Sequence, residues 1–219
     1  MKYGKKDDLS LIKLYFSEKA KIYKKLDYRK ILNLVNQIYK TYKKDGTIFI
    51  MGNGGSSGIA EGFSVDIRTH PFVSEDKSKT TLTRRPRVIC LTESSGALTG
   101  ISNDIGFSFV FSEQLKNFMR SKIINKNDLL IAFSSSGNSQ NMIEAINYVK
   151  NYNVKTSCVS GRGGGKASKI VDYPITIPGK PSYFPGQTGK NDNNFHIEDF
   201  QNSISHIVVG LLKKYIESV

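Results

Sequence analysis

Hydroxyl side chains gather in one turn of the chain, within residues 128–142 (DLLIAFSSSGNSQNM). Residues 129–133 form an apolar run long enough for a central parallel strand, and residues 141–149 carry apolar side chains at helical spacing. The turn therefore leads into a helix N-terminus, where backbone N–H groups lack partners and the helix dipole adds positive charge. Such a turn can hold an oxyanion, and phosphate fits best; a serine-rich helix cap without a ligand is the alternative. The hydroxyls belong to Ser134, Ser135, Ser136 and Ser139.

A second strand-to-helix turn is rich in glycine. Residues 47–51 (TIFIM) are followed by GNGGSSG at 52–58. Glycine permits positive φ and lets a ligand approach the main chain closely. The pattern is neither the dinucleotide fingerprint nor the P-loop, and it contains no Lys or Arg, so binding would depend on amides and hydroxyls. A plain tight connection would explain one or two glycines, but not three beside a serine pair.

Strands and helices alternate around these turns. We predict two N-terminal helices within residues 8–44, broken near residues 26–28. Beyond them we predict strand 47–51, helix 57–69, strand 87–91, helix 109–122, strand 128–133, helix 139–151, strand 154–159, short helix 165–170, strand 174–177, a Pro/Gly-rich loop at 179–194 and helix 196–217. This order predicts an α/β fold with a doubly wound, parallel five-stranded sheet. Both turns lie at carboxyl ends of strands, so they can converge on one pocket.

Length and composition narrow the class of protein. With 219 residues and 38% hydrophobic content, the chain can form one α/β domain with a sizeable core. No apolar stretch approaches 18 residues and residues 1–16 lack a signal-peptide pattern, so we expect a cytoplasmic protein without a membrane segment. Cys90 and Cys158 lie in predicted strands outside any C-x-x-C motif, which indicates reduced core thiols.

The formal net charge of +13 raises the question of nucleic-acid binding. Residues 1–46 contain 13 Lys or Arg against five Asp or Glu, so most of the excess lies on the two N-terminal helices. Lysine-rich helix faces are usually solvated, and no helix-turn-helix or RNP-like motif is present. We therefore do not expect nucleic acid as a partner; the charge would instead steer small anionic substrates.

Four motifs in register resemble the sugar isomerase (SIS) domain, and within it the phosphoheptose isomerases, also called sedoheptulose 7-phosphate isomerases. They are GNGGS at 52–56, SNDIGF at 102–107 followed by VFSEQL, SSSGNS at 134–139, and SGRGGGKAS followed by Asp172 before a short strand. The resemblance extends from about residue 8 to the C-terminus. It implies one SIS domain over residues 1–219, with an N-terminal helical hairpin (1–46) and an α/β core (47–219), assembled as a homotetramer with active sites between subunits.

The family interconverts a ketose phosphate and an aldose phosphate through an enediol, which needs a base at carbon and an acid for the oxygens. The resemblance implies Asp66 as the base, where the family has Glu, and His206 as the acid. Sedoheptulose 7-phosphate, or a related sugar phosphate for surface-polysaccharide precursors, would be the substrate. The resemblance also implies that these residues contact the substrate: Asn53, Gly54, Gly55, Ser56, Asn103, Asp104, Ser134, Ser135, Ser136, Ser139 and Glu198.

Three departures from the family pattern fall on the chemistry. Asp66 is one methylene shorter than Glu, although its ordinary pKa is similar, and a misplacement of about 1 Å can cost on the order of a hundredfold in rate. Gly62 stands where many members have a zinc-binding His, and Glu198 where they have Gln. We expect no metal cofactor; the alternative is a reduced zinc site of Asp66, Glu198 and His206.

Further readings remain open. Glu198 and His206 are eight residues apart, about 80° around an ideal helix, so both can lean toward one pocket. Without the resemblance, His206 would be interpreted as a core-edge histidine and Asp66 as a solvated carboxylate. We interpret four neighbouring residues as capping, surface or helix-end residues: His196, Glu61, Asp199 and His70. The alternative function is a non-catalytic sugar-phosphate-binding protein with a regulatory or adaptor role.

Overall fold

The computed structural model describes residues 7–179, 182–187, 189 and 192–218. Residues 1–6 of the predicted N-terminal segment lie outside this part. So do residues 180, 181, 188, 190 and 191 of the predicted 179–194 loop, and residue 219.

Five parallel strands form one sheet in the order β2-β1-β3-β4-β5, which confirms the predicted doubly wound sheet. The central strands β1 and β3 are almost wholly buried, as continuous apolar runs covered on both faces should be. The strand order reverses between β1 and β3, and ligands of such sheets bind in the crevice at this switch point. The strands are β1 (Thr47–Gly52), β2 (Arg87–Cys90), β3 (Leu129–Ser134), β4 (Lys155–Ser160) and β5 (Tyr173–Thr176).

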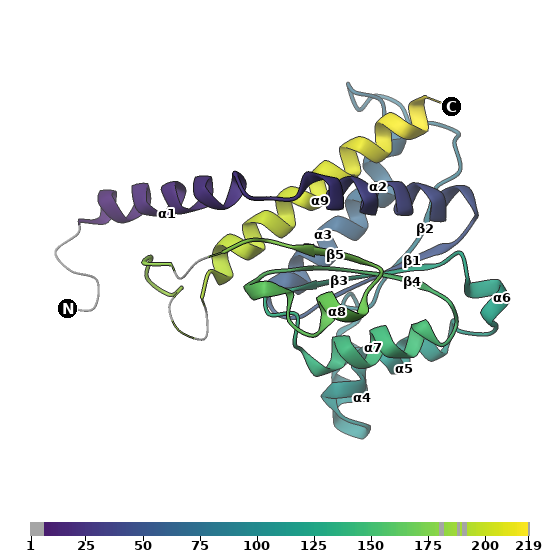
Figure 1. Ribbon diagram of the computed structural model, residues 1–219. Coiled ribbons are helices and arrows are strands. Elements are labelled where there is room, and N and C mark those ends of the chain that lie inside the picture. Colours follow the sequence, from purple (N-terminus) through teal and green to yellow (C-terminus); the bar gives the residue numbers. More distant parts are fainter. Residues whose placement is uncertain (1–6, 180–181, 188, 190–191, 219) are drawn as a thin grey trace.

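Helices cover both faces of the sheet (Figure 1). On one face α2 (Tyr28–Lys43), α3 (Gly55–Thr69) and α9 (Asn194–Glu217) enclose one core cluster. On the other face α5 (Val110–Lys116), α7 (Gln140–Lys150) and α8 (Ala167–Ile170) enclose a second cluster. Alternate side chains of β3 enter the two clusters, because successive residues of a strand point to opposite faces.

The two N-terminal helices are present, with the break where it was predicted. α1 (Asp8–Tyr23) ends before Asp27, whose side chain caps α2. Figure 1 shows α1 projecting away from the sheet in roughly the direction of α2, so the pair is extended and not folded back as a hairpin. The physical reason is that α1 has no continuous apolar stripe to pack on this chain: its one buried side chain is Ile22.

The region between β2 and β3 differs from the prediction. α4 (Ser95–Asp104) was not predicted, because it has two glycines and no buried face to create a helical pattern. The predicted helix 109–122 is shorter: α5 ends at Lys116, and α6 (Lys122–Asn125) follows after a turn. The Asn125 side chain accepts hydrogen bonds from the N–H groups of Arg120 and Ser121, which diverts them from a continuing helix. Short 3₁₀ helices also occur in the described part of the chain: η1 (His70–Phe72), η2 (Phe107–Phe109) and η3 (Arg162–Gly164).

Both cysteines are free and buried, as predicted. Burial raises the pKa of the Cys158 thiol to about 12. Among the described residues, no helix combines the length and the apolar character needed to cross a membrane.

Candidate functional site

The glycine-rich and serine-rich turns meet at the switch point of the sheet. They follow β1 and β3, which are neighbours. Asn53 in the first turn and Asn141 at the start of α7 exchange two amide hydrogen bonds, of 2.9 and 3.1 Å. This reciprocal pair ties the N-terminal ends of α3 and α7 together, so the predicted convergence is what the structure shows. Asn141 itself was not singled out from the sequence.

Glycine is required in the first turn for steric reasons. Gly54 has φ of 55° and ψ of −128°, a conformation that other residues rarely adopt. A Cβ at Gly52 would lie 2.2 Å from the carbonyl oxygen of Ser56. Ser56 is buried, and its hydroxyl donates a 2.8 Å hydrogen bond to Gln201 of α9. The turn is therefore fixed between strand and helix before any ligand arrives.

The serine-rich turn is braced by the glycine-rich segment after β4. Gly137 has φ of 64° and lies directly against the carbonyl of Gly164. Its own carbonyl accepts a 2.9 Å hydrogen bond from Ala167 N–H, and the Asn138 side chain accepts another of 2.9 Å from Lys166 N–H. Within the turn, the Ser134 hydroxyl accepts from Gly137 N–H at 3.0 Å, and the Ser136 hydroxyl from Asn138 N–H at 3.2 Å.

The two helices that begin at these turns lack side-chain caps. Neither Gly54 before α3 nor Ser139 before α7 caps its helix with a side-chain hydrogen bond. Side chains do cap α1, α2, α4 and α6. The N–H groups of Ser57 and Met142 donate to the carbonyls of Gly54 and Ser139, so the N–H groups open to another acceptor are those of the first two residues of α3 and of α7. The helix dipoles favour an anion there. We call this region, formed by residues 53–56 and 134–139, the cradle.

Glu198 lies at the edge of the cradle. A Cβ built at Gly55 would be 2.4 Å from Glu198 Oε2, so the carboxylate rests against the start of α3. Asn194 donates a 2.9 Å hydrogen bond to Glu198 Oε1. Burial raises the pKa of Glu198, and Asn194, the nearby Ser135 hydroxyl and Arg162 oppose this shift. The structure thus brings Glu198, Gly55 and Ser135 together.

Asp66 and His206, assigned to base and acid, are also neighbours. His206 Nε2 is 3.9 Å from Asp66 Oδ2, and the imidazole is 63% exposed. His70 Nε2 is 3.5 Å from the other carboxylate oxygen, Oδ1. The aspartate therefore lies between two imidazoles. His70 was interpreted as a helix-end residue, although its spacing of four from Asp66 was a usable signal for contact on one helix face.

The Asp66–His206 pair and the cradle lie at different positions along α3 and α9, which run in parallel. Gly55 and Asp66 are 11 residues apart on α3, about 16 Å along the axis. Glu198 and His206 are separated by about 12 Å along α9. Within this chain Glu198 lies against Gly55 at the cradle and His206 lies near Asp66, so the expectation that both lean toward one pocket stays a prediction.

These positions also bear on the zinc alternative. Gly62 supplies no donor, and Glu198 is engaged at the cradle, away from His206. The described residues contain no group of three or more His, Cys, Asp or Glu that could hold a metal ion. The residues present therefore do not fit the zinc site that the resemblance implies.

Asn103 and Asp104 lie at the end of α4, where both are exposed. Asn103 Nδ2 donates a 2.8 Å hydrogen bond to Asp104 Oδ1. In the described part of the chain, neither makes a hydrogen bond to the cradle residues. The structure of one chain does not bring this predicted pair to the other substrate contacts.

His196 and Asp199 hold α1 in place, and the interpretation of His196 as a capping or surface residue is wrong. His196 is fully buried, and its Nε2 lies 3.1 Å from Glu18 Oε2. The Glu18 carboxylate also accepts hydrogen bonds from the Ser182 hydroxyl (2.5 Å) and Tyr183 N–H (2.9 Å). Asp199 accepts a 2.7 Å hydrogen bond from the hydroxyl of Tyr15. Long-range contacts of this kind leave no pattern in the sequence.

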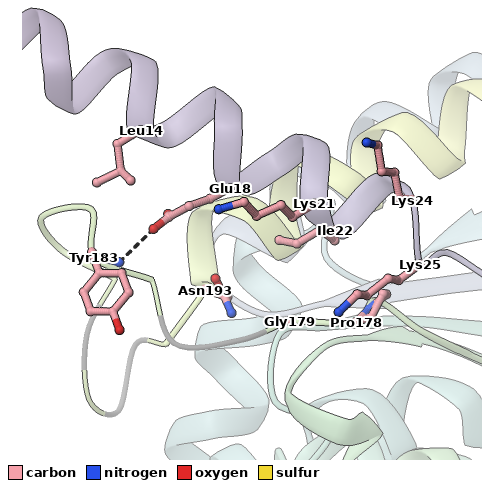
Figure 2. A pocket seen from close by; sticks show the side chains of 10 residues that line it. All are labelled: Leu14, Glu18, Lys21, Ile22, Lys24, Lys25, Pro178, Gly179, Tyr183 and Asn193. Atoms are coloured by element: carbon pink, nitrogen blue, oxygen red, sulfur yellow. Dashed lines mark hydrogen bonds between the residues drawn. The ribbon is translucent and has the colours of Figure 1, made fainter.

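A cavity of about 460 Å³ opens between α1 and the segment before α9 (Figure 2). Figure 2 shows the Glu18–Tyr183 contact bridging from α1 to this segment. The lining of the cavity is mostly apolar, with Lys21, Lys24 and Lys25 on the α1 side. No residue predicted from the sequence for the site lines this cavity.

The fold and the two turns place the chain in a known family. The model of the SIS domain family matches residues 15–161, so the chain belongs to the SIS domain family.

Its relatives include phosphoheptose isomerases. The chain is 38% identical to the phosphoheptose isomerase of Campylobacter jejuni (serotype O:6) over 136 residues, which are 62% of this chain and 66% of that protein. It is 32% identical to the phosphoheptose isomerase of Helicobacter pylori (strain Shi470), over 83% of this chain and 81% of the relative. The probable phosphoheptose isomerase of Thermoplasma volcanium is 31% identical, over 80% of this chain and 86% of that protein.

Solved structures agree on the fold. Phosphoheptose isomerase GmhA from Neisseria gonorrhoeae superimposes with a TM-score of 0.73 at 23% identity, over 95% of this chain and 97% of that one. A phosphoheptose isomerase from Francisella tularensis superimposes with a TM-score of 0.75 at 21% identity, over 95% of this chain and 100% of that one.

Proposed function

We propose that this protein is an aldose–ketose isomerase acting on a phosphorylated sugar, sedoheptulose 7-phosphate or a related substrate for surface-polysaccharide (heptose) precursors. The observation that carries the proposal is the joining of two uncapped helix N-termini at the β1/β3 switch point by the Asn53–Asn141 pair. Such a cradle suits the phosphate end of a substrate. The phosphoheptose isomerases among the relatives supply the choice of sugar.

The proposed chemistry is a proton transfer at carbon. Starting from the ketose, the Asp66 carboxylate takes a proton from C1, and the electron pair of the C–H bond forms the C1–C2 double bond of an enediol. His206 donates a proton to the former carbonyl oxygen on C2 and accepts the hydroxyl proton from O1. Return of the carbon-bound proton from Asp66 to C2 gives the aldose. No oxidant or reductant is consumed.

We infer that the working unit is a homo-oligomer, a tetramer as the family resemblance implies, with sites between copies. One support is the separation of about 16 Å along α3 between the cradle and Asp66. The second is α1, which projects from the core with Leu9, Ile12 and Phe16 exposed. In such an assembly the Asp66–His206 pair of one copy would serve the cradle of another.

Mixing experiments test this arrangement. Asp66→Asn and the double variant Ser135→Ala with Ser136→Ala should each be inactive alone. If sites are shared, subunits mixed by unfolding and refolding together should regain activity well above either parent. Failure to regain activity, in mixtures shown to contain hybrid oligomers, would place both groups in one chain.

We further propose that the reaction needs no metal, because Gly62 removes a ligand and Glu198 is held at the cradle. Dialysis against EDTA should leave turnover unchanged, and added zinc should not increase it. Loss of activity on chelation, restored by zinc, would overturn this proposal.

The decisive assay for the isomerase is exchange in deuterated water. Incubation with sedoheptulose 7-phosphate should replace the proton next to the carbonyl. Asp66→Asn should lower exchange by about 10²–10⁴-fold, the usual contribution of a general base. It should spare the thermal stabilisation by substrate, whereas the double serine variant should weaken both. Glu61→Gln, on the same helix and with its carboxylate hydrogen-bonded by Ser57, is the matched control and should exchange normally. Binding without exchange, for this and other ketose phosphates, would favour the non-catalytic alternative.

A further inference from the structure

The cradle already contains a negatively charged group from the protein itself. The Glu198 carboxylate rests against Gly55, the first residue of α3, closely enough that a Cβ there would be 2.4 Å from Oε2 and 2.6 Å from Oε1. The Ser135 hydroxyl, from the opposite turn, is close enough to lower the pKa of the same carboxyl. Glu198 therefore lies near both halves of the cradle.

A phosphate in the cradle would be a close neighbour of this carboxylate. A phosphate ester carries nearly two negative charges at pH 7, and it would use the α3 N–H groups and the Ser135 hydroxyl. Two unit charges of the same sign 4 Å apart repel appreciably even in water, and more strongly near a protein surface. Glu198 and a phosphate at the start of α3 would therefore repel each other and would occupy the same space.

The carboxylate has another partner nearby. Asn194 holds Oε1 at 2.9 Å, and the guanidinium of Arg162 donates a 3.0 Å hydrogen bond to the Asn194 side chain. Arg162 is also close enough to act on the charge of Glu198. The other charged neighbour is Asp199, which is bonded to Tyr15 and Lys19 and faces away from the cradle. A small rotation toward Arg162 would take Glu198 off α3 without leaving it unpaired.

We propose that Glu198 is a resident anion of the cradle, whose carboxylate lies against the start of α3 when the site is empty and must turn aside when phosphate enters. This inference rests on the proposed function for the identity of the site. Its consequence is that phosphate affinity is set by competition with Glu198, so the residue tunes the KM for a phosphorylated substrate without taking part in the proton transfer.

Calorimetric titration with inorganic phosphate at pH 7.5 tests the proposal. Glu198→Gln keeps the shape and removes the charge, and it should lower the Kd at least about fivefold. Glu198→Ala should also tighten binding, which guards against an effect of the new amide. Glu144→Gln on α7 is the control with the same change of charge, outside the cradle, and it should leave Kd within about twofold.

The outcomes separate the inference from the proposed function. If the glutamine and alanine variants bind phosphate no more tightly than the parent protein, or if none of the proteins binds it, the inference is wrong. If they bind more tightly but none of the proteins turns over sedoheptulose 7-phosphate or another ketose phosphate, the resident anion stands and the isomerase function fails. If turnover is present, the KM of Glu198→Gln should fall in parallel with its Kd.

Discussion

Replacing Gly137 with alanine should damage both stability and phosphate binding, because this glycine lies where the serine-rich turn meets the segment after β4. Its φ is 64°, and an added Cβ would be 2.1 Å from the carbonyl oxygen of Gly164 and 2.7 Å from its carbon. Both obstacles are backbone atoms, so no side-chain rotation can relieve the clash. The turn and the glycine segment would have to separate.

The expected cost has two parts. An alanine at positive φ costs roughly 1–2 kcal/mol. Separation of the turn also strains the hydrogen bonds from Ala167 N–H to the Gly137 carbonyl and from Lys166 N–H to the Asn138 side chain, each worth about 1 kcal/mol. Together the free energy of unfolding should fall by about 3–4 kcal/mol, which corresponds to a decrease in Tm of roughly 6–16 °C for a chain of this size.

Gly163→Ala is the matched control. Its φ of 76° imposes a similar conformational cost, but an added Cβ meets no atom within 4 Å. Thermal unfolding with and without inorganic phosphate should show a small decrease in Tm for Gly163→Ala with ligand stabilisation intact. Gly137→Ala should show the larger decrease and little stabilisation by phosphate. Equal decreases for the two variants, or full phosphate stabilisation of Gly137→Ala, would refute the reasoning.

Three further outcomes are expected. Gly58→Ala, at an exposed helical position with no atom within 4 Å of the added Cβ, should raise the free energy of unfolding by about 0.5–1 kcal/mol and should raise Tm; a lower Tm would contradict this. Burial raises the pKa of Glu18, but hydrogen bonds from Ser182 and Tyr183 and the contact with His196 outweigh it and hold the pKa below 4.5. Glu18 therefore stabilises the fold above pH 4.5, and this contribution is lost as the pH falls through its lowered pKa. Glu18→Gln should lower Tm at pH 7 and should weaken the decrease of Tm at acid pH. An unchanged dependence of Tm on acid pH would argue against this prediction. Cys158, with a thiol pKa of about 12, should react with a thiol reagent only when the protein unfolds, and rapid reaction of the native protein would disprove its burial.

The sheet and the cradle were predictable from the sequence because local patterns encode them. A buried parallel strand is a continuous apolar run, and residues 47–51 and 129–133 are such runs. Each is followed by small and hydroxyl residues at a strand's carboxyl end, and parallel strands bring those ends to one edge. The convergence of the two turns follows from these features alone.

Contacts between distant segments were not predictable in the same way. His196 was assigned to the surface because its partner Glu18 is 178 positions away, and nothing local indicates the pairing. α4 was missed because it buries no residue, so no period of apolar side chains marks it. Asp66 and His206 were found only through the family resemblance; their types and positions, taken alone, are those of ordinary helix residues.

The three departures from the family pattern fall at two places in the structure. Gly62 lies one helical turn before Asp66 and offers no ligand, while the Glu198 carboxylate lies at the cradle, against Gly55. Asp66 in turn has an imidazole near each of its oxygens, His70 at 3.5 Å and His206 at 3.9 Å. The two imidazoles therefore flank the Asp66 carboxylate, one near each oxygen. In the proposed metal-free mechanism, the shorter Asp66 and the absence of a ligand at Gly62 would be compatible with one another, and Glu198 would act at the phosphate end of the site.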